Sequence, residues 1–504
     1  MKTGNKKNYI IADFGASNGR ISVGSYNEGS FEIETVHRFE NGQVLLNGRY
    51  YWDILRLFSE LKKGILISYK KYKEITSVAI DTWGLDFAFI DKAGKLMSNP
   101  LTYRDSLKSQ RDPKNLFKNL AETEFFKLTG YFTTSIAPAF FLEKLTSEND
   151  CELANAYKIL PLSDLFNYFL TGNFAIEYST ACGMLLVNCK TKKWENRIIK
   201  AAGFNKNILS GIIDSGEPVG KVSDEIIKEL DIKTFSVVSA AGHDTASAIA
   251  GIPTVSSKYD TAFLSTGTWL VIGAETKDPI LDIKSNRHFF TNEGGALRRN
   301  FFARNITGFW IIQKCVERWE KQENRKISWK EIDEVYIKEK PFTGLINTED
   351  PVFLNNNDNM PMAIEKYCRD NNIKIPLTKA GISRCIYESL VMNVRFYFEL
   401  LKKYCSKDFK KVHVIGGGVN NVCFCQWLSN ALGVEIIAGP VEASTVGNLL
   451  MQLKADMEIA SIEEGRKICL NSVSVKSYEP EDIWMWDEKY REYLSFFNLN
   501  TIIG

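Results

Sequence analysis

A pattern of buried strand, polar turn with glycine, and second strand occurs twice in this chain, about 250 residues apart. The first turn reads Asp13-Phe-Gly-Ala-Ser-Asn-Gly-Arg20, and the second reads Ser265-Thr-Gly-Thr-Trp269. Each copy is followed by about 230 residues in which strand and helix signals alternate, which is typical of α/β folds. The repeat therefore predicts an internal duplication, with two α/β lobes at residues 1–251 and 252–504.

The charge balance and the hydropathy exclude several classes of protein. The 63 Lys and Arg residues nearly match the 61 Asp and Glu residues, so the net charge is only +2. This balance lacks the positive charge with which proteins bind nucleic acid or anionic lipid. No apolar stretch approaches the roughly 18–20 residues that a membrane-spanning helix needs. The basic N-terminus leads into only four apolar residues before Asp13, unlike a secretory signal.

We therefore expect a cytoplasmic monomer or small homo-oligomer with no nucleic-acid partner and no membrane partner. The ten cysteines include no Cys-x-x-Cys pair, and the chain has only four histidines. A structural zinc site needs several closely spaced ligands of these types. We expect reduced, mostly buried thiols instead.

Both turns of the repeat carry residue types that bind phosphate. Glycines let the backbone approach phosphate oxygens, and the amides of a turn can point at an anion. Asp13 could hold a metal ion, while Thr266, Gly267 and Thr268 could donate to phosphates. The two turns, one from each lobe, could hold one polyanion between them. Either turn alone could also be a plain β-hairpin.

A run of three glycines, Gly416 to Gly418, ends a predicted strand and precedes a predicted helix. It has neither the Lys-Ser/Thr of a P-loop nor the spacing of a dinucleotide-binding motif. Three successive glycines are costly in backbone entropy, which favours a close approach to a ligand. A sharp strand-to-helix turn is the alternative interpretation.

Two other strand ends combine groups suited to a sugar hydroxyl. Asp244, between His243 and Thr245, could be a general base or simply a helix N-cap. Asp81-Thr-Trp-Gly-Leu-Asp86 has the aromatic and polar groups of a sugar site, or is a packed turn with its tryptophan in the core. Further polar segments could reach hydroxyls or be turn residues: Asn292-Glu-Gly-Gly295 and Arg304-Asn305.

In this order, these segments resemble the FGGY family of carbohydrate kinases through most of the chain. Trp83 and the triplet His243-Asp-Thr245 are most similar to the group of that family that acts on L-rhamnulose. The stretches that carry the resemblance are Asp13-Phe-Gly-Ala-Ser-Asn-Gly-Arg20, His37-Arg-Phe-Glu-Asn-Gly42, Asp81-Thr-Trp-Gly-Leu-Asp86, Tyr103-Arg-Asp105, Gly242-His-Asp-Thr-Ala-Ser247, Ser265-Thr-Gly-Thr-Trp269, Asn292-Glu-Gly-Gly295, Gly416-Gly-Gly418 and Ala438-Gly-Pro-Val-Glu-Ala443.

The resemblance implies two actin-like (ribonuclease H-like) lobes, with ATP and a ketose in the cleft between them. It implies an ATP-dependent kinase that phosphorylates the C1 hydroxyl of L-rhamnulose in rhamnose catabolism. The first lobe would bind the sugar and carry the catalytic base, Asp244, and the second lobe would bind the nucleotide. Asp13 would help to place Mg²⁺. The implied ketose site consists of Gly84, Trp83, His243, Thr245 and Asn305. The implied ATP site consists of Ala16, Ser17, Asn18, Gly19, Arg20, Thr268, Gln313, Gly417 and Gly418.

Three points stay open at this stage. Asn420 stands where the family has Gln, whereas Asn421 fits the pattern, so the resemblance does not assign the adenosine contacts of the second lobe. The sugar-facing motifs do not specify one ketose, and L-fuculose, L-xylulose and L-ribulose are alternative substrates. A non-catalytic protein that senses a nucleotide or a sugar is a further alternative, which would bind ketose without forming ADP.

Overall fold

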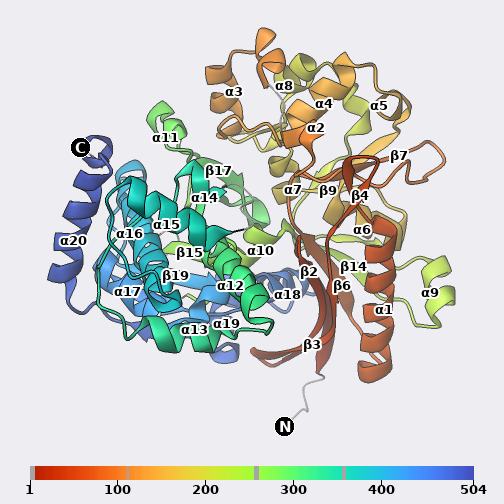
Figure 1. The fold of residues 1–504 in the computed structure, drawn as a ribbon. Helices are drawn as coiled ribbons and strands as arrows, with labels where there is room; N and C mark the ends of the chain where they lie inside the picture. Colours follow the sequence, from red (N-terminus) through yellow and green to blue (C-terminus); the bar gives the residue numbers. More distant parts are fainter. Residues whose placement is uncertain (1–5, 110–112, 255–259, 355–358, 504) are drawn as a thin grey trace. The chain divides into compact units, whose positions relative to one another are not determined.

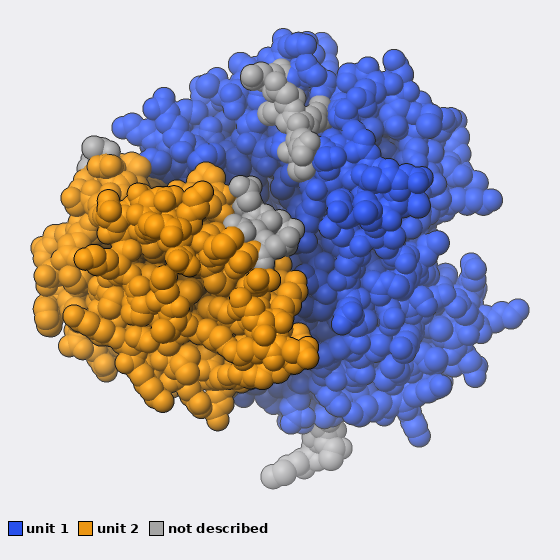
Figure 2. All heavy atoms as spheres, in the orientation of Figure 1, with its two compact units in different colours: residues 1–255, 276–302, 442–473 blue, residues 256–275, 303–441, 474–504 orange. Residues whose placement is uncertain are grey.

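The computed structural model describes residues 6–109, 113–254, 260–354 and 359–503 (Figure 1). By the density of internal contacts, the chain divides into two compact units (Figure 2). Unit 1 consists of Met1–Val255, Thr276–Phe302 and Glu442–Val473, and unit 2 of Ser256–Glu275, Ala303–Val441 and Ser474–Gly504. The chain thus returns to unit 1 twice after the division at residue 251 that the sequence predicts.

A six-stranded sheet forms the centre of unit 1. Its strands, in spatial order, are β13 (Pro218–Lys221), β14 (Ser236–His243), β6 (Ser77–Thr82), β1 (Lys7–Phe14), β2 (Asn18–Asn27) and β3 (Ser30–Glu40). β14, β6 and β1 are parallel, β1 to β3 form an antiparallel meander, and β13 is antiparallel to β14. Every residue of β6 is buried, as expected of a parallel strand covered on both faces.

Helices cover both faces of this sheet: α1 (Ile54–Tyr72), α6 (Leu162–Thr171), α10 (Asp244–Ala250) and α18 (Ala443–Ala455). α1 and α6 share one apolar core with Ile10 and Ile80. On the opposite face, Asn448 and Gln452 of α18 donate to the backbone oxygens of Ala79 and Ile10 at 3.2 and 2.9 Å. Side chains alternate between the two faces along a strand. Ile80 faces the apolar core, so Asp81, the next residue, faces α18.

A second apolar core of unit 1 is mainly helical and includes Phe125, Phe140 and Ile198. Its helices are α3 (Glu122–Thr129), α4 (Pro138–Ser147) and α8 (Asn196–Ala202). A further helix, α7 (Tyr178–Gly183), packs on β14 and links this core to the sheet. Aromatic side chains pack closely here: the ring of Phe125 makes a T-shaped contact with Phe117 at a centroid distance of 5.7 Å and a tilted contact with Phe140 at 5.3 Å.

The second sheet has seven strands. In spatial order they are β17 (Thr291–Gly294), β18 (Asn300–Thr307), β16 (Trp269–Thr276), β15 (Ala262–Thr266), β19 (Lys411–Gly416), β20 (Glu435–Ala438) and β21 (Lys476–Tyr478). β15 is antiparallel to β16 and parallel to β19, just as β1 is antiparallel to β2 and parallel to β6. This shared pairing confirms the predicted duplication of an α/β lobe.

The helices of unit 2 that matter for the site are α12 (Trp310–Glu323), α13 (Trp329–Tyr336), α16 (Lys379–Cys405) and α17 (Val422–Leu432). α16 is capped at its N-terminus by the hydroxyl of Thr378, which accepts the backbone N–H of Gly381 at 3.0 Å. Across the described residues, the helices include none with the length and apolar composition required to cross a membrane.

Candidate active site

Three parallel strands of unit 1 end side by side. Asp13 lies opposite Asp81 in the register of β1 and β6, and His243 lies opposite Thr82 in the register of β14 and β6. Asp244 follows His243 as the first residue of α10. Because the carboxyl ends of parallel strands meet at one edge of a sheet, three aspartates gather at this edge.

Asp13 and Asp81 are both buried, and α18 donates hydrogen bonds to both. Asn448 Nδ2 donates to Asp81 Oδ2 at 2.7 Å. The hydroxyls of Ser444 and Thr445 donate to Asp13 Oδ2 at 2.5 and 3.2 Å. Burial, and next the charge of Asp13, raise the pKa of Asp81 well above its usual value. A cation bound at this edge would offset the negative charge of Asp13 and favour the charged form of Asp81.

Asp13 could hold such a cation. Arg20 Nε lies 3.5 Å from Asp13 Oδ2, and the same guanidinium also pairs with Glu442. Among the described residues, no three Asp, Glu, His or Cys side chains come together as a complete metal site. Mg²⁺ needs few protein ligands, because it keeps several waters and is commonly completed by substrate phosphates. The residues present fit a Mg²⁺ ion that arrives with a phosphorylated ligand.

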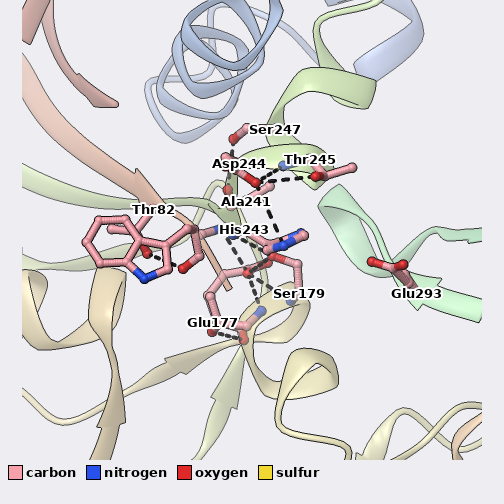
Figure 3. A network of polar contacts seen from close by, with 12 residues as sticks. Thr82, Glu177, Ser179, Ala241, His243, Asp244, Thr245, Ser247 and Glu293 are labelled. Carbon is pink, nitrogen blue, oxygen red and sulfur yellow. Dashed lines mark hydrogen bonds and ion pairs between the residues drawn. The ribbon is translucent and has the colours of Figure 1, made fainter. Parts of the chain in front are cut away.

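Asp244 is held through only one of its two carboxylate oxygens (Figure 3). Thr245 donates to Oδ1 from its backbone N–H at 2.6 Å and from its hydroxyl at 3.3 Å, and His243 Nε2 lies 3.7 Å from the same atom. Within the described segments no hydrogen bond reaches Oδ2. Burial raises the pKa of Asp244, the neighbouring His243 opposes the shift, and the charge of Asp13 adds to it. An available carboxylate oxygen with a raised pKa is suited to accept a proton.

Gly84 and Thr245 complete the surroundings of Asp244 in unit 1. Gly84 lies against the imidazole of His243, since a Cβ at this glycine would be only 2.7 Å from the ring carbon Cδ2. Thr245 is the second residue of α10 and binds Asp244 as described above. Asn305, the remaining predicted sugar-binding residue, is exposed on β18 in unit 2.

Trp83 is more deeply buried than a typical sugar platform, with 6% of its surface exposed. Its indole N–H donates to Asp86 Oδ2 at 3.0 Å, and the N–H of Trp52 donates to the same oxygen at 2.7 Å. Lys108, which is also buried, donates to the other oxygen of Asp86 at 2.9 Å. Little of the Trp83 side chain is therefore open to a sugar.

The predicted ATP-binding residues 16–20 lie in unit 1, in the turn between β1 and β2 and in the first three residues of β2. The backbone N–H of Asn41 donates to Ser17 O at 3.0 Å, and its side chain donates to Gly15 O at 2.8 Å. Gly15 N donates across the turn to Asn18 O at 2.9 Å. These bonds hold the turn in one shape while Ser17 and Asn18 remain exposed.

A cavity of about 270 Å³ lies in unit 2 at the end of β19. Its lining residues are Gly267, Phe309, Gln313, Trp329, Asp333, Tyr387, Gly417, Gly418, Asn420 and Asn421. Three of the predicted ATP-binding residues are among them, and Thr268 joins them through its hydroxyl, which lies 3.3 Å from Gln313 Oε1. Thr266 fixes the glycines, since its hydroxyl donates to Ile415 O at 2.6 Å and accepts Gly418 N–H at 2.9 Å.

The sequence analysis missed most of the remaining cavity wall. Asp333 accepts Asn421 Nδ2 at 3.0 Å, and Tyr336 donates to Asn421 Oδ1 at 2.8 Å. Burial raises the pKa of Asp333 to about 6. Asp333 and Trp329 lie on α13, whose amphipathic pattern shows only that one face is buried and gives no signal for a cavity.

Comparisons with known proteins show which family the chain belongs to. The chain matches the N-terminal domain of the FGGY family of carbohydrate kinases over residues 8–251, and the C-terminal domain over residues 262–455. The chain belongs to the FGGY family of carbohydrate kinases. The resemblance in the sequence analysis is thereby confirmed, and the protein is a carbohydrate kinase.

Relatives of this FGGY kinase include two rhamnulokinases that match over nearly the full length. That of Bacteroides thetaiotaomicron is 33% identical over 485 residues, 96% of this chain and 98% of the relative. That of Halalkalibacterium halodurans is 33% identical over 476 residues, 94% of this chain and 99% of the relative.

Solved FGGY kinase structures share the fold. A gluconate kinase and a xylulose kinase from Lactobacillus acidophilus match with TM-scores of 0.79 and 0.77. In both cases 98% of each chain is covered at 15% sequence identity. These structures confirm the α/β architecture of the FGGY kinase described here.

Proposed function

We propose that this FGGY kinase transfers the terminal phosphoryl group of ATP to the C1 hydroxyl of L-rhamnulose, giving L-rhamnulose 1-phosphate and ADP. The observation that carries this proposal is the 33% identity to rhamnulokinases over 96% of the chain. The site agrees with it, because Asp244 Oδ2 is available to accept a proton from a sugar hydroxyl.

We assign the sugar and the base to unit 1. Asp244 would take the C1 hydroxyl proton as the sugar oxygen attacks the phosphorus in line. His243 and Thr245 lie against this carboxylate and Gly84 lies against His243, while the small exposed part of Trp83 would contact the sugar. Asn305 would add a hydrogen bond to a sugar hydroxyl. Most of the rate would come from positioning and charge stabilisation rather than from covalent chemistry.

We assign the adenosine part of ATP to the cavity of unit 2. The aromatic side chains of Trp329, Phe309 and Tyr387 would pack on the base. Gln313 and Asn420 would supply polar contacts, which gives Asn420 a role although it departs from the family pattern. The phosphate groups would be bound by Thr268, Gly417, Gly418 and the turn of residues 16–20.

Asp13 would hold the Mg²⁺ that accompanies ATP. When bound, such an ion neutralises charge on the phosphate oxygens. Arg20, whose Nε lies 3.5 Å from Asp13 Oδ2, would help to hold this carboxylate in place.

The substrate assignment is tested by measuring ADP release with Mg-ATP on L-rhamnulose, L-fuculose, L-xylulose, L-ribulose and glycerol. We expect kcat/KM to be highest for L-rhamnulose, with kcat on the order of 1–100 s⁻¹. Faster turnover of another ketose would reassign the substrate but keep the reaction. An absence of turnover on every sugar, with ATP still bound, would favour a sensor instead.

Alanine substitutions at two neighbouring glycines, Gly417 and Gly418, test the assignment of the nucleotide to this cavity. In Gly418→Ala the new Cβ would lie 2.7 Å from Thr266 Oγ1 and 2.8 Å from Phe309 Cε2, so the cavity wall must shift. We expect this variant to lose about 1–3 kcal/mol of unfolding free energy and to bind ATP more weakly in calorimetry.

Gly417→Ala is the matched control for stability, because no atom lies within 4 Å of its added Cβ. We expect it to melt as the wild type does, so any loss of ATP affinity reports on the ligand alone. Wild-type ATP affinity in both variants would place the nucleotide elsewhere.

A further inference from the structure

The strand that leads to Asp244 lacks part of its regular hydrogen bonding. β14 pairs with β6 from Ser236 to Ser239, the register then shifts, and pairing resumes only at His243 opposite Thr82. Residues 240–242, between these pairs, are buried. Buried backbone N–H groups nearly always have a partner, so an N–H in this stretch that the strand pairing leaves over needs an acceptor elsewhere.

Glu177, directly before α7, supplies this acceptor (Figure 3). Its Oε2 accepts the backbone N–H of Gly242 at 3.0 Å. The hydroxyl of Ser179 donates to the same oxygen and accepts the backbone N–H of His243 at 3.2 Å. The two peptide N–H groups immediately before Asp244 are therefore tied, directly or through Ser179, to one carboxyl oxygen.

Glu177 is itself fixed from two sides and is 1% exposed. Its Oε2 caps α7 by accepting the backbone N–H groups of Ser179 at 2.8 Å and Thr180 at 3.3 Å. Its own N–H donates to Asp164 of α6 at 3.1 Å, and the Thr180 hydroxyl donates to the other oxygen of Asp164 at 2.7 Å. Because α6 and α7 both hold it, the oxygen that receives Gly242 has little freedom to move.

The surroundings favour the neutral form of this side chain. Burial raises the pKa of Glu177 to about 8, the hydrogen bonds from Ser179 and Gly242 oppose the shift, and Asp164 adds to it. Near pH 7 the Glu177 side chain therefore serves mainly as a hydrogen-bond acceptor, and its negative charge is not required for this role. A glutamine has the same length and an acceptor oxygen, whereas an aspartate keeps the acid but is shorter by one methylene.

We propose that Glu177 is a positioning residue for phosphoryl transfer: it holds the N–H groups of Gly242 and His243 and thereby places the Asp244 carboxylate at the sugar hydroxyl. The proposal rests on the proposed role of Asp244 as the base. A shift of about 1 Å in a reacting group can cost on the order of 10²-fold in rate, so a small displacement of this turn is enough to matter.

The test compares Glu177→Gln, Glu177→Asp and Glu177→Ala on whichever sugar the wild type turns over fastest. We expect Glu177→Gln to keep kcat within about 3-fold of the wild type, while Glu177→Asp and Glu177→Ala lose about 10- to 100-fold. KM for the sugar and the ATP dissociation constant should change by less than about 3-fold, because the lost interaction acts on the transition state. If Glu177→Ala does not fold, Glu177→Asp and Ser179→Ala carry the test.

A double-mutant cycle shows whether Glu177 acts through Asp244. In an Asp244→Asn background, Glu177→Asp should cause no further loss of kcat, since the group that it positions is already gone. The same loss in both backgrounds would overturn the proposal. Wild-type activity of the single variant Asp244→Asn would instead refute the role of Asp244 as the base, and this outcome is distinct from a failure of the Glu177 proposal.

Glu388 of unit 2 is a matched control for burial. It is also 1% exposed and accepts a backbone N–H, that of Phe342 at 2.9 Å. We expect Glu388→Asp to lower the melting temperature by an amount similar to Glu177→Asp, with kcat unchanged. If Glu177 were purely structural, Glu177→Asp would lower only the melting temperature and leave kcat unchanged, as Glu388→Asp does, and this would overturn the proposal. A Glu177→Gln variant as slow as Glu177→Ala would overturn it too.

Discussion

Asp244→Asn is expected to lower kcat by about 10²–10⁴-fold, the usual contribution of a general base. The amide cannot accept the proton of a sugar hydroxyl, but it has the same shape and can still accept the N–H of Thr245, which lies 2.6 Å from Oδ1. Stability and ATP affinity should therefore stay close to those of the wild type. ADP release, calorimetric titration with ATP and a thermal melt measure the three quantities.

Asp231→Asn is a suitable control for this experiment. Asp231 is an exposed residue in the left-handed conformation that ends α9 (Asp224–Leu230), where asparagine is well tolerated. It should turn over sugar at the wild-type rate. If Asp244→Asn also retained more than a tenth of wild-type kcat, Asp244 would not be the base.

Gly447→Ala is expected to destabilise unit 1 strongly. Gly447 lies inside α18 at its crossing with α10, where an added Cβ would overlap the carbonyl oxygen of Ser247. Alanine in a helix interior gains about 1 kcal/mol over glycine, but overpacking typically costs about 1–3 kcal/mol and sometimes more. The obstacle here is backbone rather than a flexible side chain, so we expect the cost to exceed the gain.

The same substitution should also reduce activity, because each helix carries one side of the site. α10 begins with Asp244, and the first turn of α18 contains Ser444 and Thr445, which donate to Asp13. Urea unfolding and kcat measure the two effects. Gly183→Ala is the control: no atom lies within 4 Å of its Cβ, so stability should be unchanged or slightly higher. Wild-type stability of Gly447→Ala would show that the two helices can separate freely.

Much of the fold follows from local patterns in the sequence. The apolar runs that begin at Tyr9 and Thr261 are strands β1 and β15, and the polar turns after them are real turns. Residues 377–405 carry apolar side chains at helical spacing, which predicts a helix, and they contain the long helix α16, Lys379–Cys405. These elements are predictable because a buried strand or helix needs apolar residues at a fixed period, and a tight turn needs residues such as glycine.

The site is predictable only in part. Asp244, Asp13 and the glycines of β19 stand at strand ends, where ligand-binding groups of α/β sheets are expected, and the structure places them there. Nothing in the sequence near Asp333 or Glu177 marks either residue. Both owe their surroundings to segments far away in the chain, such as Asn421 for Asp333 and Gly242 for Glu177.

The sequence by itself thus determined the two α/β lobes, the turns with glycine and the polar strand ends, because these depend on periodicity and backbone conformation within a few residues. Only the tertiary structure decided that residues 442–473 return to unit 1, that α18 donates to Asp13 and Asp81, and that Glu177 holds the turn before Asp244. The physical reason is that a buried polar group must find a partner wherever the packed chain brings one, and that partner leaves no local pattern in the sequence.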